Sequence, residues 1–440
     1  MKQAKRLLYP LCLSLLLAAC SGSEVPSSSV ASSAPSAAPE SPSTSLTMLT
    51  VPEGSGLYYN TQSDAGYYEI FQNGSSGCNI LYTDFATQTR VFLCSRPECT
   101  HRDDSCTSWI SNTNGGILLM AYKDNLYFFQ TGGPRQNATE EDLMHLWRMD
   151  LDGSNRELLY TFDNLHHLTG GIASDGETLY FQVASWSEDL SQRDIKLGAF
   201  HLETKEFELL CDLNDVTFIG CSGSELFFTK ITKEAAHPET LDDFANNPVS
   251  GVNTFQFTAL DVNTLEWRDV GSPVPARAPM MEGDRLLWLD GTDFSLQQMN
   301  PAGTEVTQIT DQLPIDSKTR ILTFSANPEA FSVSLPAKDG NTDEMEFYSV
   351  DLESGEVGGA PVMFHSSIKD PFPAPIRAEY GDMYLILHHD EQVQDVYYDV
   401  DGTAQPAMLN IGRLAMISKQ DYWQGNDTST PITDTVLKGK

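Results

Sequence analysis

The chain is short of positive charge. Its 440 residues include 27 lysines and arginines against 61 aspartates and glutamates, which gives a formal net charge of -34. Nucleic-acid binding depends on clustered Lys and Arg that neutralise phosphates, and anionic lipid head groups attract the same side chains. The composition therefore argues against nucleic acid as a partner. Solubility is the main expected consequence of the acidity.

Long apolar segments are also missing. We find no long run with the 3.6-residue period of a helix, so little helix is expected. The main apolar stretch, residues 7–17, is shorter than the roughly 20 apolar residues that span a bilayer. Basic residues precede this stretch at positions 2, 5 and 6, and small residues follow it. The pattern indicates a cleaved export signal rather than a membrane anchor.

The signal ends in a cysteine. Residues 17–20 read LAAC, which resembles the lipobox of bacterial lipoproteins, where the cysteine is acylated and becomes the mature N-terminus. The resemblance implies a signal peptide at residues 1–19, lipidation of Cys20, and attachment through lipid to the outer face of the cell membrane. We expect a Gram-positive host. The alternative is an ordinary secretory signal with an incidental cysteine.

A tether follows at residues 20–49. Among the 27 residues 21–47 are 11 serines, 4 prolines and 4 alanines. Such a composition cannot bury enough apolar surface to offset its ordering entropy. We therefore expect a flexible spacer, with the folded domain at residues 50–440.

The domain repeats a short motif. One half of the repeat is an Asp or Gly turn followed by an aromatic strand, and the other half is a hairpin turn after a strand end. The first half occurs at residues 123–129 (KDNLYFF), 174–181 (SDGETLYF), 223–228 (GSELFF), 283–288 (GDRLLW) and 381–385 (GDMYL). The second half occurs at residues 147–153 (WRMDLDG), 200–204 (FHLET), 260–264 (LDVNT), 299–303 (MNPAG), 350–355 (VDLESG) and 398–402 (YDVDG).

Short aromatic strands between such turns are typical of β-hairpins. A period near 45 to 50 residues predicts an all-β fold, a β-propeller of four-stranded antiparallel blades with little helix. We favour seven blades, with six or eight as alternatives, and expect residues 413–423 to help close the ring. The large aromatics of the repeat are expected to be core: Tyr127, Tyr180, Phe227, Trp288 and Tyr384. The repeat resembles that of exported TolB-like propellers over roughly residues 50–425.

Six cysteines remain after Cys12 and Cys20 are set aside. An even number in an exported chain favours disulfides. Cys78 is expected opposite Cys94 across a hairpin. The other expected pairs are Cys99 with Cys106, and Cys211 with Cys221.

A metal site is the alternative for part of this set. Cys94, Cys99, His101 and Cys106 are four ligands that suit zinc, although their spacing differs from the usual paired Cys-x2-Cys arrangement. The LCxxPxCxHx4C segment that contains them resembles one in propeller-bearing surface lipoproteins of Gram-positive bacteria. The resemblance does not decide between disulfides and zinc, and apart from that zinc no cofactor is predicted.

Catalytic motifs are scarce. His388, His389 and Asp390 are the best ligand-binding candidates, and strand alternation predicts that the two histidines face opposite ways. The longest departure from the repeat, residues 232–250, is a candidate recognition loop. We therefore expect a monomeric binding or scaffold module for a protein, peptide or glycan. The alternative is a propeller-type polysaccharide lyase or hydrolase.

Overall fold

The computed structural model describes residues 45–50, 58–72, 77–111, 116–234, 252–315, 323–336, 345–366, 372–398 and 403–436. They all belong to one compact unit, Ser43–Lys440. The predicted signal, Cys20 and most of the tether lie outside the described residues, as do residues 235–250 of the candidate recognition loop. Within the described ranges, no helix combines the length and the apolar character needed to cross a bilayer.

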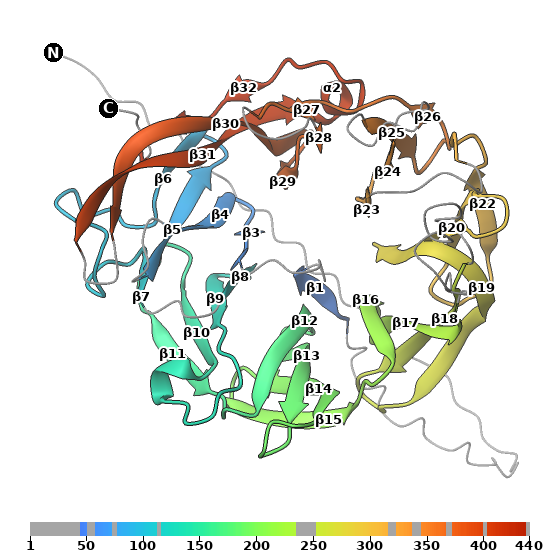
Figure 1. The fold of residues 1–440 in the computed structure, drawn as a ribbon, viewed down its shortest axis with the longest axis horizontal. Coiled ribbons are helices and arrows are strands. Elements are labelled where there is room, and N and C mark those ends of the chain that lie inside the picture. The colour runs from blue at the N-terminus through green and yellow to red at the C-terminus, as the bar shows by residue number, and fades with distance from the viewer. Residues whose placement is uncertain are drawn as a thin grey trace, which may run out of the picture. The chain divides into compact units, whose positions relative to one another are not determined.

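The described chain is almost entirely β-structure. Its helical elements are a short 3-10 turn, η1 (Glu140–Asp142), and α2 (Lys419–Trp423). The sheets radiate from a common axis. Strands that come early within their sheets, such as β12 (His166–Ser174), β16 (Val216–Ser222) and β29 (Ile376–Tyr380), lie nearest that axis (Figure 1). This is the predicted β-propeller.

Three sheets are built mainly from the first half of the chain, and a strand from the C-terminal end completes the first of them. The first sheet contains β3 (Thr61–Gln62), β4 (Gly66–Phe71), β5 (Gly77–Asp84), β6 (Thr89–Phe92) and β33 (Thr433–Asp434), with β7 (Trp109–Ser111) paired to β5. The second sheet contains β2 (Tyr58–Tyr59), β8 (Ile117–Tyr122), β9 (Asn125–Gln130), β10 (His145–Asp150) and β11 (Glu157–Thr161). The third sheet contains β1 (Thr47–Thr50), β12 (His166–Ser174), β13 (Thr178–Trp186), β14 (Arg193–His201) and β15 (Glu206–Asp212).

The second half of the chain forms the remaining sheets. The fused sheet contains β16 (Val216–Ser222), β17 (Glu225–Lys233), β18 (Thr254–Asp261), β19 (Trp267–Glu282), β20 (Arg285–Asp290), β21 (Leu296–Met299) and β22 (Val306–Thr310). The penultimate sheet contains β23 (Thr323–Ala326), β24 (Ala330–Pro336), β25 (Met345–Asp351) and β26 (Val357–Gly358). The last sheet contains β29 (Ile376–Tyr380), β30 (Met383–Tyr398), β31 (Ala404–Ser418) and β32 (Thr430–Pro431), and a separate pair joins β27 (Met363–Phe364) to β28 (Phe372–Pro373).

The prediction of seven separate four-stranded blades is wrong. The described strands form sheets of four to seven strands, besides the β27–β28 pair. The main reason is β19, which runs unbroken through two repeat units. Its first half pairs with β18 and its second half pairs with β20, so the two units share one sheet.

The repeat nevertheless predicts the core correctly. Each aromatic strand follows a tight turn and lies inside its sheet, as in the β8–β9 hairpin, where Tyr122 pairs with Asn125. Burial of these rings removes large apolar areas from water, at about 25 cal/mol per Å². All five aromatics named from the repeat are at most 8% exposed: Tyr127, Tyr180, Phe227, Trp288 and Tyr384.

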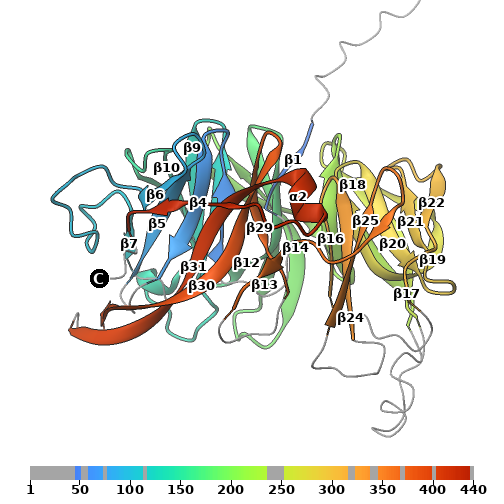
Figure 2. The same cartoon turned by 90° about the horizontal axis from the view of Figure 1, so that it is seen from above.

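The two ends of the domain meet at the first sheet. β33 pairs in parallel with β6, with Thr433 opposite Thr89. The β30–β31 hairpin extends well beyond its own sheet (Figure 2), and its Val393 and Ile411 pack against Leu81 of the first sheet. Residues 413–423 contribute to closure as expected through β31, but the sequence did not reveal β33.

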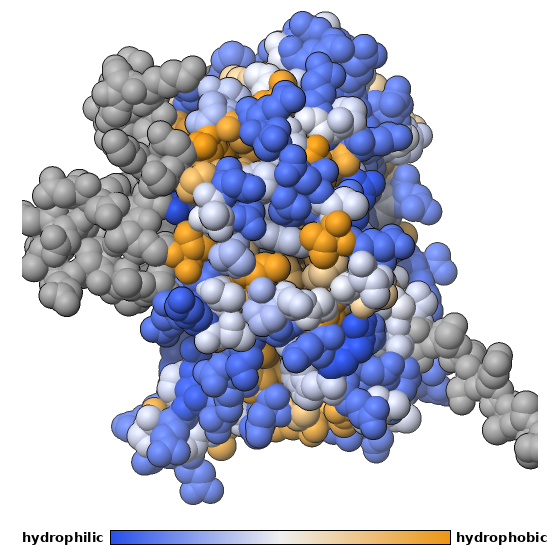
Figure 3. Space-filling view, turned by 90° about the vertical axis from the view of Figure 1, so that its right-hand side faces the viewer, coloured by the Kyte–Doolittle hydropathy of each residue, from blue (hydrophilic) through white to orange (hydrophobic). Residues whose placement is uncertain are grey.

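The surface is mainly polar. The face on the right of Figure 1, which carries β21 and β22, is mostly hydrophilic with scattered hydrophobic side chains (Figure 3). Val306, the first residue of β22, is 56% exposed. Single exposed apolar residues are normal on soluble proteins and do not define a site.

Candidate functional site

The connection between β6 and β7 gathers four metal-ligating side chains. Cys94, Cys99, His101 and Cys106 all lie on this segment, residues 93–108, which has no strand or helix of its own. Their ligand atoms lie within 4.8 Å of one another. The structure therefore brings together the whole set that the sequence offered as the alternative to disulfides.

The imidazole of His101 is fixed in orientation. It stacks on Phe92, with ring centroids 4.1 Å apart, and its Nδ1 lies 3.3 Å from Cys106 Sγ. His101 also has φ at +56°, a left-handed conformation that is uncommon for residues other than glycine. Such backbone strain is concentrated at sites that need a side chain held in place.

Arg96 supplies positive charge beside the sulfurs. Its Nη2 lies 3.3 Å from Cys99 Sγ and also donates to the Ser105 carbonyl. Burial raises the pKa of Cys94, but hydrogen bonds from the backbone and side chain of Arg96 outweigh it and lower that pKa to about 6. Burial raises the pKa of Cys106 to about 12.

None of the six cysteines is bonded to another in the structure, and the expected pairs stay a prediction that thiol alkylation can test. Cys78 lies opposite Ile110 of β7 rather than opposite Cys94, since β6 ends at Phe92 and β7 takes its place beside β5. Its side chain is buried in an apolar cluster. The other two, Cys211 and Cys221, are partly buried and pack against one shared apolar cluster.

The histidine pair on β30 forms a second polar group. A register shift between Leu387 and His389 breaks strand alternation, so the prediction of opposite-facing histidines is wrong. His388 Nδ1 lies 2.9 Å from His389 Nδ1, and His388 Nε2 lies 2.8 Å from Asp427 Oδ2. His365, which sequence reasoning missed, joins them across a bridge to His389, with its Nε2 3.8 Å from Asp427.

Asp390 borders this histidine group, because its backbone N–H donates to the carbonyl of His365 at 3.2 Å. Its carboxylate accepts hydrogen bonds from Ser366 at 2.9 Å and from Asn410 at 3.1 Å. His365 and Asp427 are exposed, His388 is partly buried, and the ligand atoms of the three residues lie within 4.8 Å of one another. The ion pair between His388 and Asp427 already accounts for this arrangement.

Three carboxylates approach one another at the turns that join inner strands of the later sheets. Lys419 Nζ contacts Glu329 and lies 2.7 Å from Glu379 Oε2, while Tyr384 donates to Glu329 at 2.7 Å. Burial, together with the charges of Glu379 and Glu329, raises the pKa of Glu282 to about 7. A carboxyl group with that pKa is suited to proton transfer near neutral pH.

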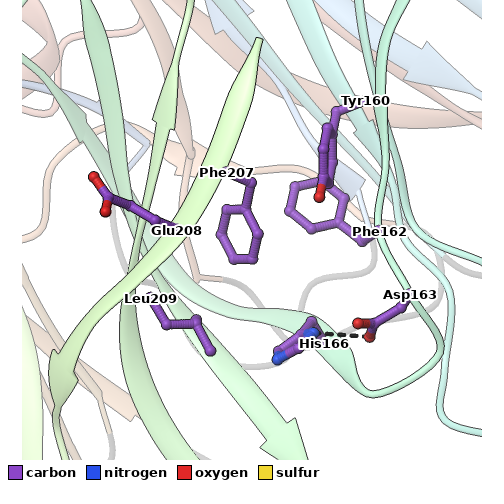
Figure 4. A pocket seen from close by; sticks show the side chains of 7 residues that line it. All are labelled: Tyr160, Phe162, Asp163, His166, Phe207, Glu208 and Leu209. Atoms are coloured by element: carbon purple, nitrogen blue, oxygen red, sulfur yellow. Dashed lines mark hydrogen bonds and ion pairs between the residues drawn. The ribbon is translucent and has the colours of Figure 1, made fainter.

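An aromatic pocket opens between the second and third sheets (Figure 4). Its volume is about 260 Å³, and it is lined by Tyr160, Phe162, Asp163, His166, Phe207, Glu208 and Leu209. The rings of Phe162 and Phe207 meet edge to face at 4.9 Å, with Tyr160 4.8 Å from Phe162.

Polar groups border these rings. His166 Nδ1 lies 2.7 Å from the Asp163 carboxylate, and Glu208 is exposed at the opposite side (Figure 4). The neighbouring His167 is buried, and its two ring nitrogens contact the carbonyls of Gly132 and Asn164. These contacts give His167 a structural role. A concave aromatic surface with a few polar groups at its edge is the usual form of a small binding site.

Comparison with known proteins supports the fold but does not support any particular catalytic or binding activity. No family model and no curated protein matches the chain. Among solved structures, it is similar to the β-propeller domain of the Trilobed protease from Pyrococcus furiosus, at 10% identity and TM-score 0.45, over 89% of this chain and 100% of that one.

Two further structures show the range of these similarities. Acylaminoacyl peptidase from Pyrococcus horikoshii has 11% identity and TM-score 0.45 over 88% of this chain, which spans about half of the peptidase (52%). TolB from Acinetobacter baumannii has 12% identity and TM-score 0.30, over 82% of this chain and 77% of that one. TolB is thus among the fold neighbours, and at such scores none of them carries an argument about function.

Proposed function

We propose that this chain is an exported, lipid-anchored propeller that acts as a binding module for a peptide or glycan outside the cell. The observation that carries the proposal is the aromatic pocket between the second and third sheets, lined by Tyr160, Phe162 and Phe207. The export signal, Cys20 and the tether support its location at the outer face of a membrane.

The pocket suits one ring or one side chain. Its volume of about 260 Å³ lies just below the usual range for drug-sized ligands, roughly 300 to 1,000 Å³. Aromatic faces bind the apolar face of a sugar or a hydrophobic side chain, while the Asp163 carboxylate can accept hydrogen bonds from hydroxyl or amide groups. A longer partner would extend from the pocket along β15, the outermost strand of the third sheet.

A pair of leucine variants tests this proposal. The full chain is first screened against glycan and peptide arrays, and the dissociation constant of the best ligand is measured by calorimetry. Leu209, at the pocket edge, is 36% exposed, and Leu158, outside the pocket, is 41% exposed. We expect L209R to weaken binding at least about 10-fold, which corresponds to about 1.4 kcal/mol, and L158R to leave it unchanged.

Equal affinity of the two variants would show that the ligand binds elsewhere. Circular dichroism and thermal unfolding verify that both variants are folded. Because both substitutions place arginine on an exposed outer strand, any nonspecific effect of the new charge on affinity would be common to the two.

An enzymatic role is the second candidate. It is favoured by the approach of Glu282, Glu329 and Glu379, together with the raised pKa of Glu282. Paired carboxylates of different pKa perform acid and base catalysis in glycoside hydrolases. Turnover of any glycan found in the same screen would replace the binding role with this one.

A further inference from the structure

We propose that Cys94, Cys99, His101 and Cys106 bind one structural Zn²⁺ ion. The site would hold the connection between β6 and β7 in place. This inference goes beyond the proposed binding role and does not depend on it.

The spacing of the ligand atoms fits tetrahedral zinc. Bonds of about 2.3 Å to sulfur and about 2.0 Å to nitrogen place ligand atoms roughly 3.5 to 3.8 Å apart. All four ligand atoms lie within 4.8 Å of one another, and the pair between His101 Nδ1 and Cys106 Sγ is already at 3.3 Å. Small side-chain rotations are enough to complete the geometry.

The number and type of donors favour metal over disulfides. Three sulfurs share the cluster, so any one disulfide would leave the third thiol unpaired beside an imidazole. Cys78, the fourth cysteine nearby in sequence, lies opposite Ile110 within an apolar cluster. Three thiolates and one imidazole form a closed set of four ligands, which is typical of structural zinc.

The surroundings of the sulfurs supply the contacts that metal-bound thiolates need. The backbone N–H of Arg96 donates to Cys94, and the backbone N–H of Ser108 donates to Cys106. Each donor is two residues after its cysteine. Zn²⁺ with three thiolates and a neutral imidazole carries a net charge of -1, and the Arg96 guanidinium 3.3 Å from Cys99 Sγ offsets it. Binding would release the proton of each thiol to solvent.

The connection is long for a segment without a helix or strand. Segments longer than about 12 to 15 residues without secondary structure are uncommon in compact domains unless they carry a function. Residues 93–108 form such a segment. Its C-terminal end is fastened by Arg156, whose guanidinium donates to the carbonyls of Thr107 and Trp109. A metal at the cluster would fasten the remainder.

The test is direct measurement of metal in the full chain. Elemental analysis of the purified protein is expected to give about one zinc per chain, and alkylation without reductant is expected to show no disulfide among these cysteines. Replacing zinc by Co²⁺ should produce the intense visible absorption of tetrahedral thiolate coordination. One disulfide with no metal, or a Co²⁺ spectrum typical of octahedral oxygen ligands, would overturn the proposal.

Matched serine variants locate the metal. C99S is expected to weaken zinc binding by ~100-fold or more in competition with a chromophoric chelator, since even changes around the ligands cost 10- to 100-fold. C211S, a thiol outside the cluster, is expected to bind zinc as the wild type does. Full zinc content and unchanged affinity in C99S would contradict the assignment.

Extraction of the metal keeps the test independent of whether C99S folds. Wild-type chain stripped with a chelator at mildly acidic pH should regain one zinc and its original thermal unfolding temperature when Zn²⁺ is returned. If the stripped chain takes up no zinc while folded, the proposal fails.

Discussion

Two contacts between neighbouring sheets are built in opposite ways. The aromatic seam between the second and third sheets packs Phe129, Phe162 and Phe181, with Phe129 and Phe181 edge to face at 5.2 Å. The closing seam between the first and last sheets also has an apolar part. It adds a charge network in which Asp434 lies 3.1 Å from Arg90 and 2.9 Å from Arg413.

The difference follows from the distance along the chain. The sheets of the aromatic seam are consecutive, so their strands meet after short connections. The closing seam joins residues 344 positions apart, and bringing the ends together costs loop-closure entropy. Apolar rings tolerate several arrangements, whereas buried charges need their partners in place. We infer that the network selects the register in which β33 meets β6.

The largest effect on stability is predicted for a substitution in the aromatic seam. Phe181 is 1% exposed, and F181A removes a ring that contacts Phe129, Phe162 and Phe207. Because the cavity cannot be filled by its neighbours, we expect a loss of about 3 to 5 kcal/mol in the free energy of unfolding, measured in urea. F324A, which removes a 45% exposed ring, should cost less than about 1 kcal/mol. Equal losses in the two variants would show that Phe181 stabilises the fold no more than an exposed ring does.

The next largest effect on stability is predicted for a substitution in the closing seam. D434N removes the carboxylate shared by Arg90 and Arg413, whose side chains are 5% and 16% exposed. We expect a loss of about 3 kcal/mol in urea unfolding, because two guanidinium groups lose a buried partner. E391Q removes a partner of Arg413 that is 52% exposed, so its expected cost is below about 1 kcal/mol. If D434N is as mild as E391Q, the network does not hold the ring closed.

The smallest effect concerns a carboxyl group that lacks such pairing. The pKa of Glu282 is raised from 4.5 to about 7 by burial and by Glu379 and Glu329. The folded state therefore holds this proton more tightly than the unfolded state, and that stabilisation is complete below pH 4.5 and lost as pH rises through 7. E282Q should match the wild type near pH 4 and exceed it by about 1 to 2 kcal/mol at pH 8, after allowance for solvent screening.

Urea unfolding of both proteins from pH 4 to pH 8 measures this difference. E203Q serves as the control, because Glu203 is exposed in the turn between β14 and β15 and should show no such dependence. A stability difference between E282Q and the wild type that stays constant across this range would contradict the expected titration.

Local patterns in the sequence predicted much of the fold. Turn residues before aromatic strands identified hairpins, and Tyr127, Tyr180 and Trp288 are buried as expected. Pairing between distant strands could not be predicted in the same way. The continuous β19 and the parallel β33–β6 contact depend on where separate segments meet, and neither has a sequence signal of its own.

The candidate sites differ in the same way, because local sequence patterns predicted some of their residues and contacts between distant segments supplied the others. The sequence supplied Cys94, Cys99, His101 and Cys106 as a set but left disulfides and zinc open, because spacing alone does not fix distances. His365 and Asp427 were missed, since they lie far from His388 in sequence and reach it through a bridge and a loop. The aromatic pocket was missed too, because its lining comes from β11, β12, β15 and the segment between β11 and β12.

By itself, the sequence determined the period of the strands, their buried aromatic positions and the acidic composition, because each of these is a property of neighbouring residues. The tertiary structure decided which thiols meet, which charges are paired at the closing seam and where a pocket opens. Those features depend on distances between side chains that are brought together only when the sheets pack around their common axis.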